Sequence, residues 1–326
     1  MRAWRQLLRD AGYGGTDFAG QIEPAARRHF EPLERLHPAP NDLIVIRYSA
    51  WSPGLARLLE RPQRKLLVYH NITPPDYLWI HSPGLAVQCA VGRLQTAAFA
   101  RAARVVTADS DFSAQELSEV AGDRVRVVPI LFDPARLTER GPAPEGDGPL
   151  VLVVSRLAPN KRHDRVFRAF AAYQRECERG ARLLCVGTAL TPRYAKLMVS
   201  LVEASGARNV TLAGGLPQDQ VNAAYAEASV LLTLSEHEGF CVPLLEAFHF
   251  GVPVVAAPAG AVPGVAANAA LLTDGDVAVT AELLDLAVRD SELREELVRR
   301  GRDRLADFSY ERTAASVHDA VSGALA

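Results

Sequence analysis

The sequence predicts an α/β protein with two domains, each built on a parallel sheet that helices cover on both faces. Apolar runs of strand length alternate with helical segments along the chain, which is typical of strands buried on both sides. The chain has 326 residues, which is enough for two domains of ordinary size. Residues 138–149 are rich in proline and glycine and offer no apolar core position, so we expect an interdomain linker there.

We therefore expect an N-terminal domain over residues 1–137 and a C-terminal domain over residues 150–304, followed by a helical tail over 305–326. The N-terminal strands are expected at 43–48, 65–70, 104–108 and 125–131, with a weaker one at 16–19. The C-terminal strands are expected at 150–155, 182–186, 210–213, 230–234, 252–256 and 270–272. Functional side chains in such sheets lie beyond the carboxyl ends of the strands, so we look for a site in the loops that follow them.

Composition and charge argue against several functional classes. The formal net charge is -2, which gives no reason to expect a nucleic-acid partner. No apolar run is long enough to span a bilayer, and the first residues lack the pattern of a secretory signal. The 4 cysteines are scattered, with no C-x-x-C pair, which favours a reduced cytoplasmic protein over a disulfide framework or a zinc site.

The first residues, 1–10, have a helical pattern with Trp4, Leu7 and Leu8 on one face and arginines around them. Two interpretations stay open for this helix. It packs in the core and keeps a solvated basic side, or it forms a surface that attracts anionic lipid. We therefore leave open a weak peripheral contact with the inner face of the membrane.

The most informative stretch is VLLTLSEHEGFCVPLLEAFHFGVPVVAAP, residues 230–258, which we interpret as strand, loop, helix and strand. Pro243 suits the first turn of the helix. The backbone N–H groups of residues 240–245 would point at one place beyond the strand ends, which suits a phosphate. Glu238 and Glu246 frame the loop, and their carboxylates can accept hydrogen bonds from sugar or ribose hydroxyls. The pattern favours a nucleotide-sugar site; the alternative is a helix cap beside a solvated glutamate.

The segment SEHEGFCVPLLEAFHFGVPVVAA resembles the Glu-x7-Glu signature of the retaining family 4 glycosyltransferases, a branch of the glycosyl transferases group 1. The resemblance implies the GT-B fold, in which two Rossmann-like domains face each other across a cleft. It also implies that the last helix crosses back onto the first domain. The resemblance covers the chain from about Ile44 to the C-terminus and is most specific in the C-terminal half.

The same resemblance implies roles for individual residues. Glu238 would orient the hydroxyls of the donor sugar at the catalytic centre, and Glu246 would bind the ribose of the nucleotide. The backbone around Leu216 would contact the nucleobase. The segment that would hold the diphosphate through its backbone consists of Gly239, Phe240, Cys241 and Val242.

A second segment, SRLAPNKRHD, places Arg156 and Lys161 on a loop that follows a strand. Two cations at a strand end can hold a diphosphate, arginine by its fork and lysine as a point charge; the alternative is a solvated basic loop. The segment resembles the phosphate-binding segment of the family, which implies that role for both residues. Asn160 is expected to cap the following helix. Arg162 stands where the family usually has glycine, and we expect little consequence.

The segment VYHNITPP places His70 at the carboxyl end of an expected strand. A lone histidine is more often structural than functional. Many family members have a histidine after this strand, however, and the resemblance implies a place near the sugar and the acceptor. His70 would stabilise charge near the anomeric carbon or help with the acceptor proton. Asn71 is a secondary candidate for a contact with the acceptor or the sugar.

The segment containing Asp109 and Asp111 has the form of the D-x-D metal motif of another glycosyltransferase fold. We interpret it as a helix start instead, because Ser113 and Glu116 have the spacing of a capping box. No metal and no cofactor are therefore expected.

Members of the family normally begin with a strand and a glycine-bearing loop, whereas this sequence opens on the helix that would follow that loop. We therefore expect an N-terminal domain without its first strand. The predicted activity is a metal-independent transfer of a sugar, with retention of configuration, from a nucleotide-diphosphate sugar to a glycan or glycolipid acceptor. Cell-surface polysaccharide biosynthesis is the role that the resemblance suggests. A non-catalytic partner subunit that binds the nucleotide-sugar, and a sugar-nucleotide epimerase on the same fold, stay open as alternatives.

Overall fold

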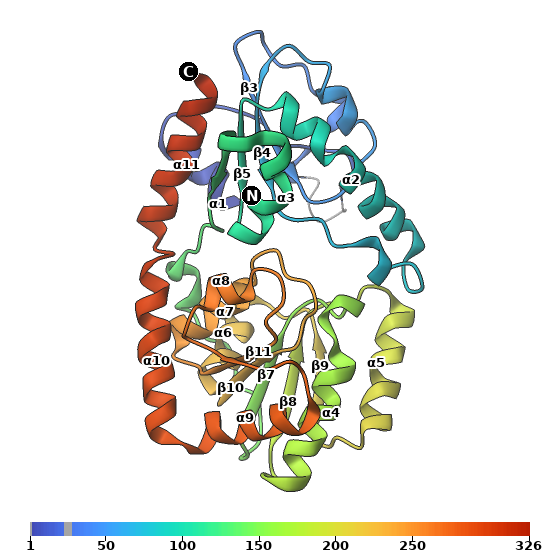
Figure 1. The fold of residues 1–326 in the computed structure, drawn as a ribbon, viewed down its shortest axis with the longest axis vertical. Coiled ribbons are helices and arrows are strands. Elements are labelled where there is room, and N and C mark those ends of the chain that lie inside the picture. Colours follow the sequence, from blue (N-terminus) through green and yellow to red (C-terminus); the bar gives the residue numbers. More distant parts are fainter. Residues whose placement is uncertain (1, 23–27) are drawn as a thin grey trace. The chain divides into compact units, whose positions relative to one another are not determined.

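A computed structural model of the chain describes residues 2–22 and 28–326 (Figure 1). Met1, at the start of the expected first helix, lies outside the described residues. The chain forms two compact units, each with its own parallel sheet. Unit 1 comprises Met1–Trp79, Pro83–Leu131 and Tyr310–Ala326, and unit 2 comprises Ile80–Ser82 and Phe132–Ser309.

Unit 1 is built on a four-stranded parallel sheet with the order β3-β4-β5-β6. Its strands are β3 (Leu43–Tyr48), β4 (Arg64–Tyr69), β5 (Val105–Ala108) and β6 (Val125–Val127). The first is as predicted, and β4 ends one residue before His70. The last is shorter than the predicted 125–131. A separate pair of short parallel strands is formed by β1 (Phe18–Ala19) and β2 (Glu31–Pro32).

Among the described residues of unit 1, the α-helices that accompany the sheet are α1 (Arg2–Asp10), α2 (Pro83–Ala102), α3 (Asp111–Ala121) and α11 (Tyr310–Leu325). Figure 1 shows α11 alongside β4 and β5, and its Val317 packs with Leu66 and Val68 of β4. Leu7 of α1 is buried in the same cluster. The apolar face of α1 is therefore part of the core, which favours the packing interpretation of this helix over the lipid one.

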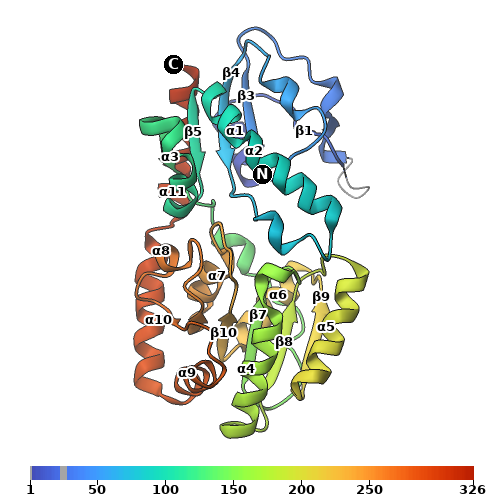
Figure 2. The same ribbon diagram turned by 45° about the vertical axis from the view of Figure 1, so that its right-hand side comes forward.

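Unit 2 is built on a six-stranded parallel sheet with the order β12-β11-β10-β7-β8-β9. Figure 2 labels β7, β8, β9 and β10 of this sheet. The strands are β7 (Leu150–Val154), β8 (Arg182–Val186), β9 (Val210–Gly214), β10 (Val230–Thr233), β11 (Val254–Ala256) and β12 (Leu271–Leu272). The helices are α4 (His163–Glu176), α5 (Pro192–Ser205), α6 (Gln218–Glu227), α7 (Val242–Phe250), α8 (Val262–Ala266), α9 (Val277–Arg289) and α10 (Ser291–Ala306). All six predicted strands are present, with ends that differ by a few residues.

The core of unit 2 follows from its apolar runs. Val151 and Val153 of β7 pack with residues of α4, α5 and α9 on one face of the sheet. The alternate residues Leu150 and Leu152 are also buried and face the other side, where α6 contacts β7 and α7 packs on α6. A central parallel strand of this kind has no polar face, which explains the uninterrupted apolar run that the sequence shows.

The strand order of unit 2 reverses between β7 and β10, which are neighbours in the sheet but far apart in the chain. From β7 the chain winds outward to β8 and β9, and from β10 it winds the other way to β11 and β12. The loops after β7 and β10 therefore leave the sheet side by side. Such a switch point is where parallel α/β sheets bind ligands.

The structure bears on three local expectations. Helix α3 is capped by Ser110, whose side chain accepts a hydrogen bond from the backbone N–H of Ser113, so the expected box of Ser113 and Glu116 is wrong. Glu116 instead accepts hydrogen bonds from Tyr69 and Arg93. Residues Phe132 to Pro149, which include the expected linker, belong to unit 2.

The third expectation, that Asn160 caps α4, is wrong, because Arg162 occupies the N-cap position of that helix. The four cysteines are all free. Within residues 2–22 and 28–326, no helix combines the length and the apolar character needed to cross a bilayer.

Candidate active site

The site in unit 2 begins with an ion pair between the two loops at the switch point. Lys161, on the loop after β7, donates a hydrogen bond from Nζ to Oε1 of Glu238, on the loop after β10, at 2.6 Å. The side chains are 18% and 9% exposed, so the pair lies in a largely desolvated place. Seventy-seven residues separate the partners in the chain. The register of β7 against β10 is what brings them together.

Asn160 joins the same two loops through its backbone and its side chain. Its carbonyl accepts a hydrogen bond from the N–H of Glu236 at 2.8 Å, and its Nδ2 donates to the carbonyl of His237 at 3.3 Å. These bonds hold the residue before Lys161 against the residues before Glu238. Asn160 is buried, so both bonds are shielded from water. The sequence offered no signal for this role beyond the polar character of the residue.

A third loop, after β11, is hydrogen-bonded to the backbone of Glu238. The N–H of Ala261 donates to the carbonyl of Glu238 at 2.9 Å. Gly260 has a φ of +58°, and a Cβ on it would lie 2.2 Å from that carbonyl oxygen. Only glycine fits so close to another backbone in this conformation. Gly260 is therefore a site residue that the motif analysis missed.

The expected diphosphate segment forms the tight entrance to α7. Cys241 has a φ of +76° and precedes the first helical residue, Val242. Phe240 is buried, with its ring edge-on to Phe308 at 5.6 Å and 89°. Gly239 and Val242 are partly exposed. A left-handed residue at the helix start turns the chain sharply, which leaves the first N–H groups of α7 at the carboxyl edge of the sheet.

Glu246 lies within the first turns of α7 and is held by Tyr225 of α6. The Tyr225 hydroxyl donates to Oε2 of Glu246 at 2.8 Å. Burial raises the pKa of the Glu246 carboxyl, while this hydrogen bond and the charge of Arg136 lower it. The net direction is upward, and these two neighbours limit the rise in pKa that burial causes.

The two remaining expected residues of unit 2 are less enclosed. Arg156 is exposed, two residues beyond the end of β7. Leu216 is partly buried and follows β9. Both lie at the carboxyl side of the sheet, where the ion pair also lies, because β7 and β9 are parallel strands of one sheet.

A charged network beside Lys161 was not expected from the sequence. Arg162 has left-handed φ and ψ angles of 49° and 45°. Its guanidinium forks onto Asp164, with both hydrogen bonds at 2.9 Å, and pairs with Glu236. Arg165 also pairs with Glu236, at 3.0 Å. The positive φ explains why glycine suits this position, and the ion pairs show how an arginine is held there.

His163 follows the network and is buried to 1% exposure. Burial lowers the pKa of His163 to about 4, and the charge of Lys161 adds to that effect. Its Nε2 lies 3.3 Å from the hydroxyl of Ser155, and its Nδ1 has no hydrogen-bond partner among the described residues. His163 is therefore a neutral core residue at physiological pH.

The expected residues of unit 1 form a separate cluster. His70 Nδ1 lies 3.5 Å from Oδ2 of Asp109, at the ends of two neighbouring strands. Burial lowers the pKa of His70; the Asp109 carboxylate opposes this and the charge of Arg47 adds to it. Asn71 is buried with a φ of +55°, and its Nδ2 lies 3.4 Å from the Ser113 hydroxyl.

Asp109 is more than a helix-start residue. It is 5% exposed, and its second oxygen, Oδ1, is buried without a hydrogen-bond partner among the described residues. Its position orients the imidazole of His70 rather than capping α3. Across residues 2–22 and 28–326 no group of histidine, cysteine and acidic side chains could hold a metal ion.

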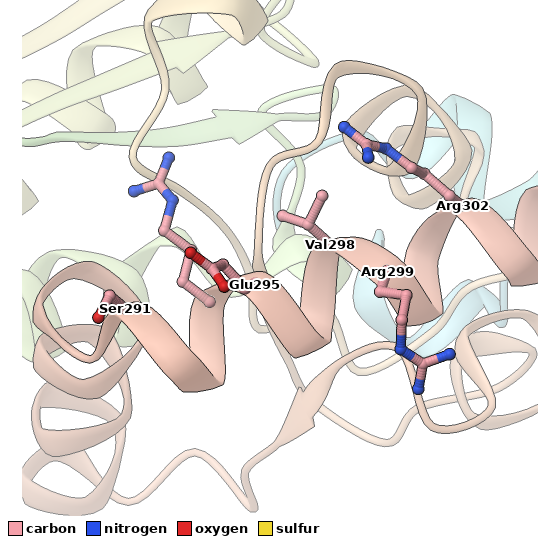
Figure 3. Close-up of a pocket in the computed structure, with 6 residues that line it drawn as sticks. Ser291, Glu295, Val298, Arg299 and Arg302 are labelled. Atoms are coloured by element: carbon pink, nitrogen blue, oxygen red, sulfur yellow. The ribbon is translucent and has the colours of Figure 1, made fainter.

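A surface hollow of unit 2 lies along α10. Figure 3 shows its lining: Ser291, Arg294, Glu295, Val298, Arg299 and Arg302. Arg299 pairs with Glu296 and Asp303 of the same helix, so part of its charge is already compensated. None of the residues predicted for the site lines this hollow.

Comparisons with known proteins agree on one family. The model of the family described as glycosyl transferases group 1 matches residues 136–304. A D-inositol 3-phosphate glycosyltransferase of Salinispora arenicola is 30% identical over 230 residues, which are 67% of this chain and 51% of the relative. The O-antigen chain mannosyltransferase B of Escherichia coli is 36% identical over 100 residues, 30% of this chain and 26% of the relative. The chain spans about half the length of the D-inositol 3-phosphate glycosyltransferases that it matches.

Solved structures show the same fold. The glycosyltransferase from Rickettsia africae has a TM-score of 0.75 at 12% identity, covering 99% of this chain and 94% of its own. Anabaena HepE in complex with UDP and glucose has a TM-score of 0.67 at 19% identity, covering 80% of this chain and 72% of its own. The fold is the GT-B fold that the sequence predicted.

Proposed function

Because the chain belongs to the glycosyl transferases group 1 family, we propose that it transfers a sugar from a nucleotide-diphosphate sugar to a glycan or glycolipid acceptor. The observation that carries this proposal is the pair of Lys161 and Glu238 at the switch point of unit 2. A cation and a hydroxyl-binding carboxylate side by side match the two ends of the bond that a glycosyltransferase breaks. That bond joins the donor sugar to the diphosphate.

In this proposal Lys161 and Arg156 stabilise the negative charge that grows on the leaving diphosphate. The charge of Lys161 is compensated by Glu238 in the free protein, so the exposed Arg156 and the first N–H groups of α7 supply the remaining attraction for the phosphates. When the donor binds, the Lys161 ammonium can turn to a phosphate oxygen, which leaves the Glu238 carboxylate to accept from sugar hydroxyls. Glu238 positions the sugar here and is not a covalent nucleophile.

His70 acts in unit 1 as the group that meets the acceptor or the anomeric carbon. Since burial lowers its pKa, the imidazole is neutral near pH 7 and can accept a proton or a hydrogen bond. Asp109 would keep the proton on Nδ1, which leaves Nε2 as the acceptor. Asn71, the next residue, is the further polar group for an acceptor contact.

The finer features of the proposal rest on the resemblance and on the relatives. Retention of anomeric configuration and independence from metal are what the resemblance to the Glu-x7-Glu signature implies. A GDP-mannose-dependent alpha-(1-6)-phosphatidylinositol monomannoside mannosyltransferase of Mycobacterium tuberculosis and the O-antigen mannosyltransferase point to a lipid-linked or cell-surface glycan as acceptor. A cytoplasmic enzyme at the inner face of the membrane would meet such an acceptor, although α1 contributes its apolar face to the core.

The test is a thermal-shift screen against UDP, GDP, ADP and dTDP. A nucleotide at a hundred times its dissociation constant stabilises the folded protein by about 2.7 kcal/mol, which is readily visible. Lys161→Ala and Glu246→Ala should abolish the shift. Lys196→Ala and Glu295→Ala, which remove exposed charges of the same kind outside the site, should keep it.

One nucleotide that shifts the wild type and both controls, but neither site variant, would support the donor site and name the base. A shift from no nucleotide at all would refute the donor-binding proposal. Binding without turnover of the matching nucleotide-sugar on any acceptor or water would support a non-catalytic partner subunit instead.

A further inference from the structure

Tyr225 is a buried tyrosine whose hydroxyl is closer to one hydrogen-bond acceptor than to the other. It lies on α6, is 0% exposed, and donates to Oε2 of Glu246 at 2.8 Å. The carbonyl of Pro243 is farther from the same hydroxyl, at 3.4 Å. Burial and the neighbouring carboxylate of Glu246 raise the pKa of Tyr225 well above its ordinary value. The phenol therefore keeps its proton and can donate it to Glu246, the nearer of the two acceptors.

The ring of Tyr225 is fixed by the helix that carries Glu246. It stacks on Phe250 of α7, with ring centroids 5.5 Å apart and planes at 1°. The guanidinium of Arg140 lies over the Phe250 ring, 5.8 Å from its centroid. A stacked ring has little freedom to swing, so the hydroxyl is held at one place against the carboxylate.

Helix α6 also holds the second group that acts on Glu246. Asn222, one turn before Tyr225, is fully buried and donates from Nδ2 to the carbonyls of Arg136 at 3.2 Å and Glu139 at 2.8 Å. The charge of Arg136 lowers the pKa of Glu246. One helix thus places both influences that oppose the rise in the pKa of Glu246 caused by burial.

The balance at Glu246 is delicate because burial is the largest influence on it. Burial raises the pKa of the carboxyl, and the Tyr225 hydrogen bond is the first of the two opposing influences; Arg136 is the second. Cys241, the other titratable group near Glu246, has a pKa raised well above its ordinary value by burial, so its thiol is neutral. Without the hydroxyl, Glu246 would take up a proton at a higher pH than in the native protein.

We propose that Tyr225 is the positioning residue of the ribose subsite: it engages one oxygen of Glu246 so that the other accepts hydrogen bonds from the ribose hydroxyls. This inference rests on the proposed function, in which Glu246 binds the ribose of the donor. A carboxylate oxygen fixed in place accepts a hydroxyl without losing rotamer freedom, and a hydrogen bond to an ionised oxygen is stronger than one between neutral groups. Tyr225 itself need not touch the nucleotide.

The test compares the Tyr225→Phe variant with the wild type on matched nucleotides. The probes are the best-binding of UDP, GDP and ADP and its 2′,3′-dideoxy counterpart, with dissociation constants measured by calorimetry at pH 7.5 and 6.0. We expect the variant to bind the ribonucleotide about tenfold more weakly at pH 7.5, which is about 1.4 kcal/mol, and to bind the dideoxynucleotide within about twofold of the wild type. The loss should be larger at pH 6.0, where the variant's Glu246 is more protonated.

Tyr173→Phe is the matched control. Tyr173 is also a fully buried tyrosine of unit 2, but it lies on α4 and its hydroxyl has no hydrogen-bond partner among the described residues. Its loss should leave both dissociation constants unchanged. If Tyr225→Phe does not fold, Phe250→Leu loosens the stacked ring and should weaken the ribonucleotide by about threefold with the same selectivity.

The outcomes separate the two proposals. Equal affinity of Tyr225→Phe and wild type for the ribonucleotide at both pH values would overturn the positioning role while the donor site stands. An equal loss for ribonucleotide and dideoxynucleotide would also overturn it, because that is the result of a general structural role. A wild type that binds no nucleoside diphosphate would refute the donor site, and the positioning role with it.

Discussion

Arg162 offers the sharpest test of how this chain builds its site, because its backbone and its side chain have opposite effects. Its φ of +49° is a left-handed conformation, while its guanidinium pairs with Asp164 and Glu236. Arg162→Gly removes both the strain and the ion pairs. Arg162→Ala removes the ion pairs and keeps the strain, so the difference between the two variants isolates the backbone.

The magnitudes follow from the structure. A left-handed conformation costs a residue with a Cβ about 1–2 kcal/mol. Glycine gives back about 0.4–1 kcal/mol of this because its unfolded chain is more flexible. The glycine variant should therefore be more stable than the alanine variant by about 0.5–1 kcal/mol. The side chains of the pairs are 23–30% exposed, so each pair contributes about 0.2–1 kcal/mol and the alanine variant should lose about 1 kcal/mol against the wild type.

Two measurements are made on each variant: urea-induced unfolding, and hydrogen exchange of the amides of β7 and β10, which report on unit 2. Arg165 supplies the matched control, since it pairs with the same Glu236 but lies in the first turns of α4. At that helical position the order should reverse, with Arg165→Ala more stable than Arg165→Gly by up to about 1 kcal/mol. The reasoning is refuted if Arg162→Ala is as stable as Arg162→Gly, or more so.

Three further outcomes are expected. The pKa of His163 is about 4 in the folded protein and 6.5 in a free histidine, so the unfolded chain binds more protons between these two pH values. The free energy of unfolding should therefore be lower by about 2 kcal/mol at pH 5 than above pH 6.5. This loss should be absent in His163→Gln, and urea unfolding at both pH values would show or contradict it. Gly260→Ala should displace Glu238 and weaken nucleotide binding at least tenfold in the calorimeter, and an unchanged affinity would show that the loop yields freely. Ser110→Ala should lose about 1 kcal/mol of thermal stability as the cap of α3, whereas Ser118→Ala within the helix should lose little; equal losses would contradict the capping role.

Much of the fold could be predicted from the sequence because it depends on local patterns of apolar residues. The apolar runs of β7 and β10 became buried strands, since a strand in the middle of a parallel sheet meets helices on both faces, whereas the edge strands β6 and β9 are partly exposed. The end of α7 was also local: Gly251 takes a left-handed conformation at the helix end, as its lack of a Cβ allows. The Glu-x7-Glu signature indicated the family for the same reason, because its two glutamates belong to one loop and the helix that follows it.

Predictions about polar residues were less reliable where a tertiary partner decided the outcome. Ser113 and Glu116 have capping-box spacing, yet Ser110 caps the helix and Glu116 turns to Tyr69 and Arg93. Asn160 looked like a cap and instead bonds to His237. A short polar side chain can bond locally or across the fold, and the sequence does not rank the two.

The sequence by itself determined the parallel sheets, the family signature and the two glutamates, because these depend on side-chain type and spacing over a few residues. The tertiary structure decided what each carboxylate bonds to: Lys161 for Glu238 and Tyr225 for Glu246. It also decided that Gly260 must lack a side chain. Each of these contacts joins residues that follow different strands of one sheet. Strand order and register bring such residues together, and neither is encoded in any single stretch of the chain.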